Sequence, residues 1–176
     1  MLLSKLTWWQ FIKLIGLMAT GYRIDAIRII GENVMRDKGL IGLGIDSVDA
    51  CTAEVREFFD VLANRDNFPV LVHCTQGKDR TGLTVLLTLL LLGVPLPAAQ
   101  YDYMATQGQL DSEREERLRE IASIGLPESF ADCDPEFVAA IDRHIQEEYG
   151  GVSQYLSHAG VGEETQNAVK EHLKMP

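Results

Sequence analysis

The segment from His73 to Gly82, HCTQGKDRTG, carries the most reactive combination of side chains in the sequence. Arg80 follows Cys74 by six positions, and one of the five residues between them is a glycine. A loop of this size can turn its backbone N–H groups toward one centre, to which a following helix adds its N-terminal donors and its dipole. A guanidinium can grip two oxygens of an anion at that centre. The segment therefore predicts a phosphate-binding loop with a cysteine at its base.

This arrangement indicates nucleophilic chemistry on phosphorus. A positive environment lowers the pKa of a thiol, and the thiolate is the reactive form of Cys74. Its attack on a bound phosphoryl group would give a cysteinyl-phosphate that water then hydrolyses, while Arg80 and the backbone donors stabilise the oxygens in transfer. No metal or other cofactor is needed for these steps. The residues predicted to bind the substrate phosphate are Thr75, Gln76, Gly77, Lys78, Asp79 and Arg80.

The leaving oxygen also needs a proton, and Asp79 is the carboxylate nearest in the sequence, so we predict it to be the general acid. Asp46 and Asp49 are alternatives, because an upstream loop could fold over the site.

The neighbours of these residues have supporting roles. Lys78 adds a second positive charge that could contact a further phosphate, and Thr81 could hydrogen-bond the thiolate and favour its departure. His73 more plausibly orders the loop than acts as a base. Each residue alone has an ordinary structural interpretation, since an isolated apolar cysteine is usually inert. Together, at this spacing, they favour a catalytic loop, and the Asp79 that follows Lys78 excludes a Walker A motif.

The segment resembles the signature of the cysteine-dependent protein tyrosine phosphatase superfamily. The version of this signature that contains Gly77-Lys78-Asp79-Arg80 is similar to that of a tyrosine phosphatase family found in fungi and bacteria, the mycobacterial tyrosine phosphatase B-like family. Residues 39–46 and the terminal Tyr149-Gly150-Gly151 also resemble segments of that family. The resemblance implies a Cys74 nucleophile, an Arg80 phosphate ligand and an Asp79 acid. It also implies phosphorylated partners that range from phosphotyrosine to phosphoserine, phosphothreonine and phosphoinositides.

The elements that must position the loop follow from local patterns. Pro69 to His73 is short, apolar and valine-rich, which predicts a strand buried on both faces, and an apolar helix follows from about Thr81. Gly39 to Gly44 predicts a loop or short strand, and Ser112 with Glu115 forms a capping-box pattern that opens a helix ending at Gly125. Periodic stripes and stop signals predict further helices at 7–18, 24–35, 52–64, 98–107, 134–150 and 163–173.

The resemblance implies an α/β fold, a protein tyrosine phosphatase-like sandwich with a parallel sheet flanked by helices. The sequence predicts one strand, at 70–73, and residues 24–30 and 40–45 are further candidates. A strand in a parallel sheet needs neighbouring strands on both edges. We therefore expect residues 1–176 to form a single, helix-rich phosphatase-like domain without its upstream strands. On this interpretation the chain is the C-terminal part of a longer domain.

Composition narrows the function classes. The 176 residues hold 16 basic and 26 acidic side chains, a net charge of −10, which argues against nucleic acid as a partner. Three cysteines, Cys51, Cys74 and Cys133, favour a reducing, cytoplasmic compartment over a disulfide scaffold. The histidines have no metal-site spacing. No segment is predicted to cross a membrane, and the apolar N-terminus up to Tyr22 is expected to pack as a helix rather than lie on a membrane.

Three functions compete on these grounds. The leading hypothesis is a metal-independent phosphomonoesterase. The second is a non-catalytic module of the same family that recognises phosphate. The third is sulfur or arsenic chemistry on a cysteine loop, as in rhodaneses and arsenate reductases, which Thr81-Gly82 fits less well.

Overall fold

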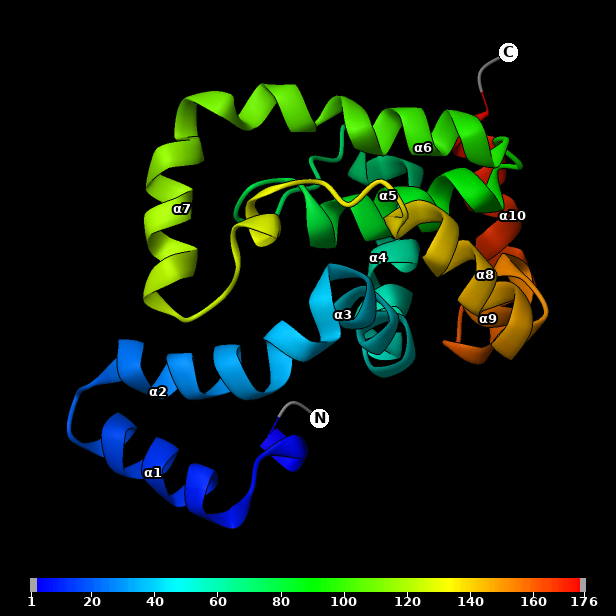
Figure 1. Ribbon diagram of the computed structural model, residues 1–176. Helices are drawn as coiled ribbons and strands as arrows, with labels where there is room; N and C mark the ends of the chain where they lie inside the picture. Colours follow the sequence, from blue (N-terminus) through cyan, green and yellow to red (C-terminus); the bar gives the residue numbers. More distant parts are fainter. Residues whose placement is uncertain (1–2, 175–176) are drawn as a thin grey trace. The chain divides into compact units, whose positions relative to one another are not determined.

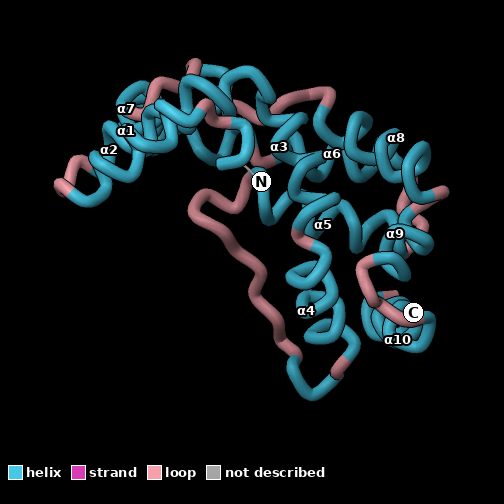
Figure 2. The backbone as a smooth tube through the Cα atoms, turned by 90° about the horizontal axis from the view of Figure 1, so that it is seen from below, coloured by secondary structure: helices cyan, strands magenta, loops and turns pink. Residues whose placement is uncertain are grey.

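The computed structural model describes residues 3–174, and helices make up its regular structure; no β-strand forms within that range (Figures 1 and 2). Met1, Leu2, Met175 and Pro176 lie outside the described residues. The α-helices are α1 Trp8–Ala19, α2 Arg23–Ile30, α3 Arg36–Ala50, α4 Thr52–Ala63, α5 Asp79–Leu91, α6 Leu96–Ala105, α7 Arg114–Ser123, α8 Phe137–Tyr149, α9 Val152–His158 and α10 Glu163–Leu173. Short 3₁₀ turns lie at Leu3–Lys5, Arg65–Asn67, Gln107–Glu113 and Glu128–Ala131, and a π-helical turn at Gly31–Met35.

The chain folds into two compact units that interleave in the sequence. The first unit comprises Met1–Leu43 and Gln107–Asp134, and the second comprises Gly44–Thr106 and Pro135–Pro176. The cysteine loop belongs to the second unit.

The first unit begins with a helical hairpin. The Thr7 side chain accepts a hydrogen bond from the Gln10 backbone, and Gln10 in turn accepts from the Thr7 N–H, so a capping box starts α1. Leu14 of α1 packs with Ala26 and Ile29 of α2 in a small buried cluster. A second cluster of the same unit, around Ile121, holds α7 against the turns that follow it. Each cluster is small because one apolar face of each short helix is all that can be buried.

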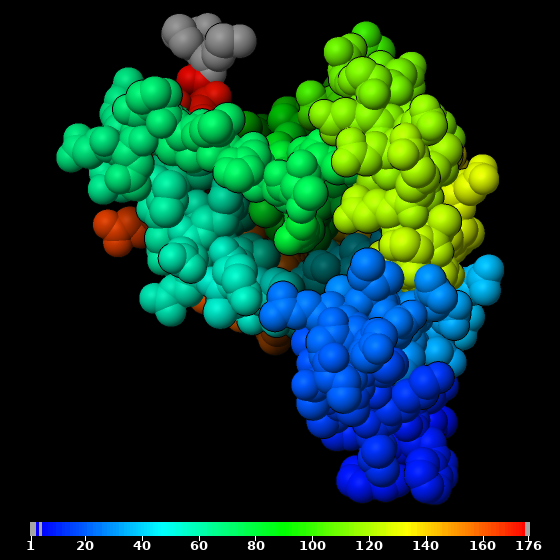
Figure 3. All heavy atoms as spheres, turned by 90° about the vertical axis from the view of Figure 1, so that its left-hand side faces the viewer, coloured from blue at the N-terminus to red at the C-terminus, as the bar shows by residue number. Residues whose placement is uncertain are grey.

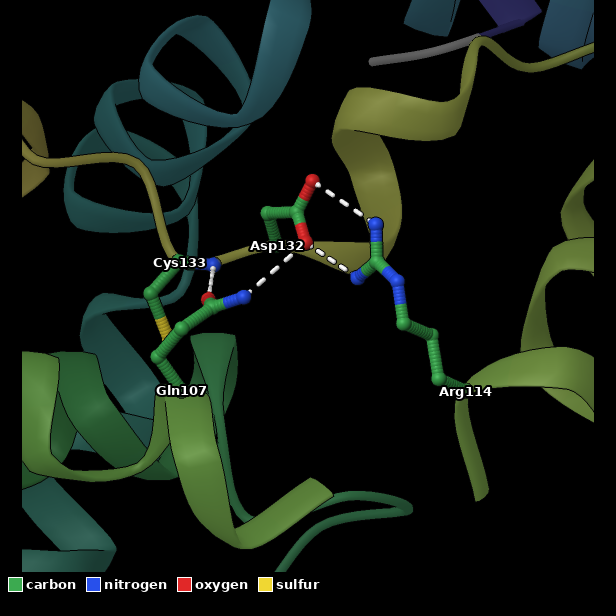
Figure 4. A network of polar contacts seen from close by, with 4 residues as sticks. All are labelled: Gln107, Arg114, Asp132 and Cys133. Carbon is green, nitrogen blue, oxygen red and sulfur yellow. Dashed lines mark hydrogen bonds and ion pairs between the residues drawn. The ribbon is translucent and has the colours of Figure 1, made fainter. Parts of the chain in front are cut away.

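A network of polar contacts joins the two ends of the second segment of this unit, Gln107–Asp134 (Figure 4). Asp132 accepts hydrogen bonds from Arg114 and from Gln107 Nε2, the latter at 2.9 Å. The Gln107 carbonyl oxygen accepts from the backbone N–H of Cys133 at 2.5 Å. The network therefore ties the segment 132–133 to the start of α7 and to the turn before it.

The second unit has the larger apolar core, in which α5 packs on α6 and α9, and α8 packs on α6 and α9. Leu87 of α5 and Ile141 of α8 are fully buried, as are Phe59 of α4 and Leu156 of α9. Burial of a large aliphatic or aromatic side chain contributes about 1.5–3 kcal/mol. The core thus fixes α5, the helix that follows the cysteine loop.

The prediction of an α/β sandwich with a parallel sheet is wrong for the described residues. Residues 69–74 form a loop between α4 and α5 (Figure 2), and the Leu71 side chain is 84% exposed rather than buried. Backbone N–H and C=O groups form a strand only where a second extended segment pairs with them. The other two candidate strands, at 24–30 and 40–45, are helical. No second extended segment therefore pairs with residues 69–74 between residues 3 and 174.

Other local predictions also need correction. Residues 39–44 belong to α3, and only Gly39 departs from helical geometry, with φ +64°. Ser112 lies inside a 3₁₀ turn and α7 has no side-chain cap, so the capping box expected there does not form. The helix α9 was not predicted. The expected helices at 7–18, 52–64, 98–107 and 163–173 are confirmed to within a few residues.

Candidate active site

The candidate site is the loop that enters α5, and it begins at Cys74, after the extended residues 69–73. Gly77 has φ +70°, a left-handed conformation that costs a side-chain-bearing residue strain. The first turn of α5 closes with a hydrogen bond from the Gly82 N–H to the Lys78 carbonyl oxygen at 2.7 Å. The turn at Gly77 thus lets the chain reverse from the extended segment into the helix within a few residues.

The environment of Cys74 favours its thiolate. Burial alone raises the pKa of this half-buried thiol, but the backbone N–H groups of Thr81, Gln76 and Gly77 stabilise the thiolate and outweigh it. The buried Thr81 hydroxyl, which has no other hydrogen-bond partner among residues 3–174, acts on the pKa in the same direction. Together they lower the pKa of Cys74 from 9.0 to about 6. Hydrogen bonds to the charged form are the physical cause, because each one stabilises the negative sulfur and not the thiol. At neutral pH the sulfur is therefore mostly ionised.

Arg80 lies one residue into α5 and its side chain is exposed. Its Nη2 donates a hydrogen bond to the Thr75 hydroxyl at 3.1 Å. This contact folds the guanidinium back onto the loop that carries Cys74. A guanidinium has five N–H donors, so one contact with Thr75 leaves others that can meet an anion above the loop.

Lys78 and Asp79 form an ion pair at the junction of loop and helix. Lys78 Nζ donates to Asp79 Oδ1 at 2.9 Å, and the Lys78 side chain is only 1% exposed. A buried ammonium requires such a partner because the desolvation of an isolated charge is costly. Lys78 is therefore held within the second unit, and its charge acts from beneath the loop surface rather than from a mobile side chain.

The helix α5 approaches its neighbour closely just after the loop. A Cβ atom on Gly82 would meet the Tyr103 ring of α6 at 2.9 Å, closer than carbon atoms can lie. Tyr103 is itself stacked on Phe137 of α8, with ring centroids 5.1 Å apart. Gly82 of the motif thus allows the packing that fixes the first turn of α5, a role that the spacing of the motif does not reveal.

The two upstream aspartates lie on the last part of α3. Asp46 is half-buried on α3. Asp49 Oδ1 accepts hydrogen bonds from His144 Nε2 at 2.7 Å and from the Tyr149 hydroxyl at 2.8 Å. Burial and this bond raise the pKa of Tyr149 to about 12, so the phenol stays a donor at neutral pH. Asp49 is therefore engaged in holding α3 to α8.

This cluster was not foreseen as a unit by the sequence analysis. Tyr155 adds to it by donating to the Val48 carbonyl oxygen at 2.9 Å, and the Tyr149 ring lies against His158 at 5.2 Å. The available signal was the Tyr149-Gly150-Gly151 segment, whose aromatic residue stands at the end of α8. Its partners come from distant parts of the chain, so spacing alone could not assign them.

The structure places Gln76, Gly77 and Thr81 near the sulfur of Cys74. Arg80 is turned back on Thr75 of the same loop. The ring nitrogen Nδ1 of His73 lies 3.3 Å from the Cys74 carbonyl oxygen, on the backbone and not on the thiol. Within residues 3–174, no group of three or more histidine, cysteine, aspartate or glutamate side chains is placed to hold a metal ion. The arrangement can bind an oxyanion and present a thiolate to it.

Several known phosphatases are similar in sequence to this chain. A triple specificity protein phosphatase, PtpB, of Mycobacterium tuberculosis is 29% identical over 117 residues, which cover 58% of this chain and 42% of that protein. A tyrosine-protein phosphatase of Nostoc commune is 28% identical over 130 residues, 68% of this chain and 44% of that protein. The chain thus spans less than half the length of these relatives. Residues 35–175 match the model of the tyrosine phosphatase family, and the chain belongs to that family.

Proposed function

We propose that the protein is a metal-independent phosphomonoesterase that acts through a cysteinyl-phosphate on Cys74. The observation that carries the proposal is the Arg80 guanidinium, which is folded back on Thr75 of the same short loop that carries Cys74. The pKa of the Cys74 thiol, lowered to about 6, supports it. The donors that stabilise the thiolate are also those that a phosphate oxygen would meet. Membership of the tyrosine phosphatase family supports a phosphate ester as the substrate.

In the first step the Cys74 sulfur attacks phosphorus, an S–P bond forms and the P–O bond to the leaving group breaks. Arg80 and the loop N–H groups stabilise the negative charge on the three remaining phosphoryl oxygens. Asp79, which takes up a proton from solvent and leaves its ion pair with Lys78 as the substrate binds, delivers this proton to the leaving oxygen. In the second step Asp79 takes a proton from water as the water attacks phosphorus, the S–P bond breaks, and Thr81 stabilises the departing thiolate. The products are an alcohol or phenol and inorganic phosphate.

The substrates that we propose are phosphotyrosine, phosphoserine or phosphothreonine in proteins and, beyond these, phosphoinositides. The name of the mycobacterial relative, a triple specificity phosphatase, supports a broad range. The buried Lys78 contributes positive charge beneath the loop without a steric demand of its own. A reducing compartment fits the proposal, because a thiolate nucleophile must stay unoxidised and no disulfide joins Cys51, Cys74 or Cys133.

The test is hydrolysis of p-nitrophenyl phosphate by the full chain, by Cys74→Ser and by Cys51→Ser as the matched control. We expect activity in the wild type and the control, inhibition of both by vanadate, and no turnover by Cys74→Ser. Retained binding of phosphate by Cys74→Ser, measured calorimetrically, would show an intact loop. Turnover by Cys74→Ser would disprove the assignment of the nucleophile.

A second candidate is a phosphate-recognition module without catalysis. The observation in its favour is that residues 69–73, directly before the nucleophile, have no paired strand among the described residues to hold them. Such a module would bind a phosphotyrosine peptide with the wild-type loop and release it unchanged. Incubation of the peptide with the chain, followed by mass spectrometry of the peptide, separates the two candidates.

A further inference from the structure

The hairpin of α1 and α2 has apolar side chains on both of its faces, and only one of these faces is covered. The inner face of α1 contributes Leu14, which is buried against Ala26 and Ile29 of α2. The opposite face of α1 is as apolar as the inner one. Surface helices of water-soluble domains normally place polar residues there.

The uncovered face is an aromatic and aliphatic stripe along α1. Trp8 and Trp9 are 72% and 79% exposed, and Ile12, Ile15 and Met18 are exposed as well. Trp8, Ile12 and Ile15 recur at intervals of four and three residues, which places them on one side of the helix. On α2, Ile24 and Ile27 repeat the pattern. The remaining exposed large hydrophobic residues of the described chain, outside the first 27 residues, are Val61, Leu71 and Tyr101.

Charge separates this hairpin from the rest of the chain. Residues 1–30 hold four basic side chains and one acidic one, a net charge of +3. Because the whole chain carries −10, the remaining residues carry −13. The acidic residue is Asp25, and the basic residues are Lys5, Lys13, Arg23 and Arg28. Figure 3 shows the side chains of this region, coloured blue, from one side.

We propose that the α1–α2 hairpin, residues 8–30, binds the surface of a lipid bilayer that carries anionic headgroups. The exposed tryptophans replace the sequence-based expectation that the segment up to Tyr22 packs on the domain and does not lie on a membrane. Tryptophan prefers the boundary between headgroups and acyl chains, and basic side chains beside an apolar helix face are attracted to anionic lipids. A second copy of the chain or an apolar protein groove would cover the tryptophans equally well. Two copies that paired hairpin to hairpin would bring two positive surfaces together, whereas anionic headgroups neutralise the positive charge beside the tryptophans.

The hairpin would lie in the interface and would not span it. α1 has 12 residues, so at the helical rise it is about 18 Å long, well short of the roughly 30 Å hydrocarbon core. None of the helices between residues 3 and 174 has the length and apolarity to cross a bilayer. The proposal is independent of catalysis, since no residue of the cysteine loop takes part.

The chain contains its own probe, because its two tryptophans, Trp8 and Trp9, both lie in the proposed surface. The experiment adds vesicles of phosphatidylcholine alone, or of phosphatidylcholine with phosphatidylserine, to the full chain. Intrinsic fluorescence and co-sedimentation are measured together. We expect a blue shift and co-sedimentation with the anionic vesicles, and weakening of both as salt is raised.

Two pairs of variants separate the apolar and the electrostatic contributions. Ile12→Ser with Ile15→Ser keeps both tryptophans and should abolish the blue shift, whereas Tyr101→Ser removes an equally exposed aromatic residue elsewhere and should not. Lys5→Glu with Lys13→Glu should lower vesicle affinity by about 25-fold or more, because each basic side chain near an anionic surface contributes about fivefold. Lys170→Glu with Lys174→Glu makes the same change of charge at the other end of the chain and should leave the affinity nearly unchanged.

Two outcomes would overturn the proposal. One is an unchanged spectrum and no co-sedimentation with anionic vesicles. The other is a blue shift that appears without lipid as protein concentration rises, accompanied by dimers in sedimentation velocity, which would assign the face to a second copy of the chain. Circular dichroism of each variant confirms that its helices are intact.

Discussion

Two half-buried cysteines precede helices in the second unit, and their thiols behave in opposite ways. Cys51 occupies the N-cap position of α4, next to the positive end of that helix. Burial, and then the nearby Glu54, nevertheless raise the pKa of its thiol. Cys74 stands several residues before α5, yet the pKa of its thiol is lowered to about 6.

The difference shows that proximity to a helix N-terminus does not by itself make a nucleophile. The dipole of a helix contributes typically 0.3–1 kcal/mol at an exposed site. In the case of Cys51, desolvation and an acidic first turn exceed that contribution. Cys74 differs because backbone and side-chain donors point at its sulfur from Gln76, Gly77 and Thr81. The turn at Gly77, and not the helix alone, accounts for the difference between the pKa values of the two thiols.

The largest effect should come from Arg80→Lys. A lysine keeps the charge but loses the planar fork, so stabilisation of the equatorial oxygens falls. We expect kcat to drop by about 10³-fold, within the range found for arginines that act on a transferring phosphoryl group. Arg56→Lys, on α4 where Arg56 pairs with Asp60, is the control and should leave kcat unchanged. An equal loss in both variants would mean that the effect is general destabilisation.

The next effect tests the proton donor. Asp79→Asn cannot protonate the leaving oxygen, so kcat/KM for phenyl phosphate, which reports the first step and not the hydrolysis of the cysteinyl-phosphate, should fall by about 10²-fold or more. The loss should be much smaller for p-nitrophenyl phosphate, whose leaving group needs no proton. Asp46→Asn serves as the comparison. If it shows the selective loss and Asp79→Asn does not, the acid comes from α3 and not from the loop.

A smaller effect concerns the two thiols directly. Alkylation by iodoacetamide follows the thiolate, so the rate at Cys74 should rise with pH about a midpoint near its pKa of about 6. The rate at Cys51 should rise only above the ordinary thiol range, because its pKa is raised. Thr81→Val removes a donor to the Cys74 sulfur and should move the first midpoint upward.

Thr84→Val is the matched control for that shift. Its hydroxyl donates to the Thr81 carbonyl oxygen at 2.8 Å, within the helix and not toward the sulfur. The Cys74 midpoint should therefore stay in place. Peptide mapping assigns the label to each cysteine, and coincident profiles for Cys51 and Cys74 would contradict the comparison.

The smallest effect is expected from Glu54→Gln. Removal of the carboxylate should lower the pKa of Cys51, because the charge of Glu54 disfavours its thiolate. Burial is the larger cause and remains, so the thiol should still titrate above that of Cys74. The alkylation profile of Cys51 measures the shift. A profile that became identical to that of Cys74 would mean that one acidic residue, and not the loop, distinguishes the two sites.

Much of the helical structure could be predicted because its signals are local. Val55, Phe59 and Leu62 repeat at helical spacing, and they are buried on one face of α4. The strand at Pro69–His73 was predicted on the same kind of local evidence and is absent. A strand depends on partners from elsewhere in the chain, and a run of apolar residues cannot supply them.

The chemistry that we propose for the site follows from residue types and spacing, whereas its packing does not. The order of Cys74, Gly77 and Arg80 predicts a phosphate-binding loop with a cysteine at its base. Burial of Lys78 and the contact of Gly82 with Tyr103 depend on the neighbouring helices. The same holds for Asp49, which was a candidate acid because an upstream loop could fold over the site. In the structure it accepts hydrogen bonds from His144 and Tyr149.

The most direct test of the central claim is to trap the intermediate. The full chain is mixed with p-nitrophenyl phosphate, quenched in acid within the first turnover, and digested for mass spectrometry. We predict a phosphoryl group on the peptide that contains Cys74 and none on the peptide that contains Cys51. Turnover with phosphate on another residue, or with no phosphorylated Cys74 at any quench time, would contradict the account.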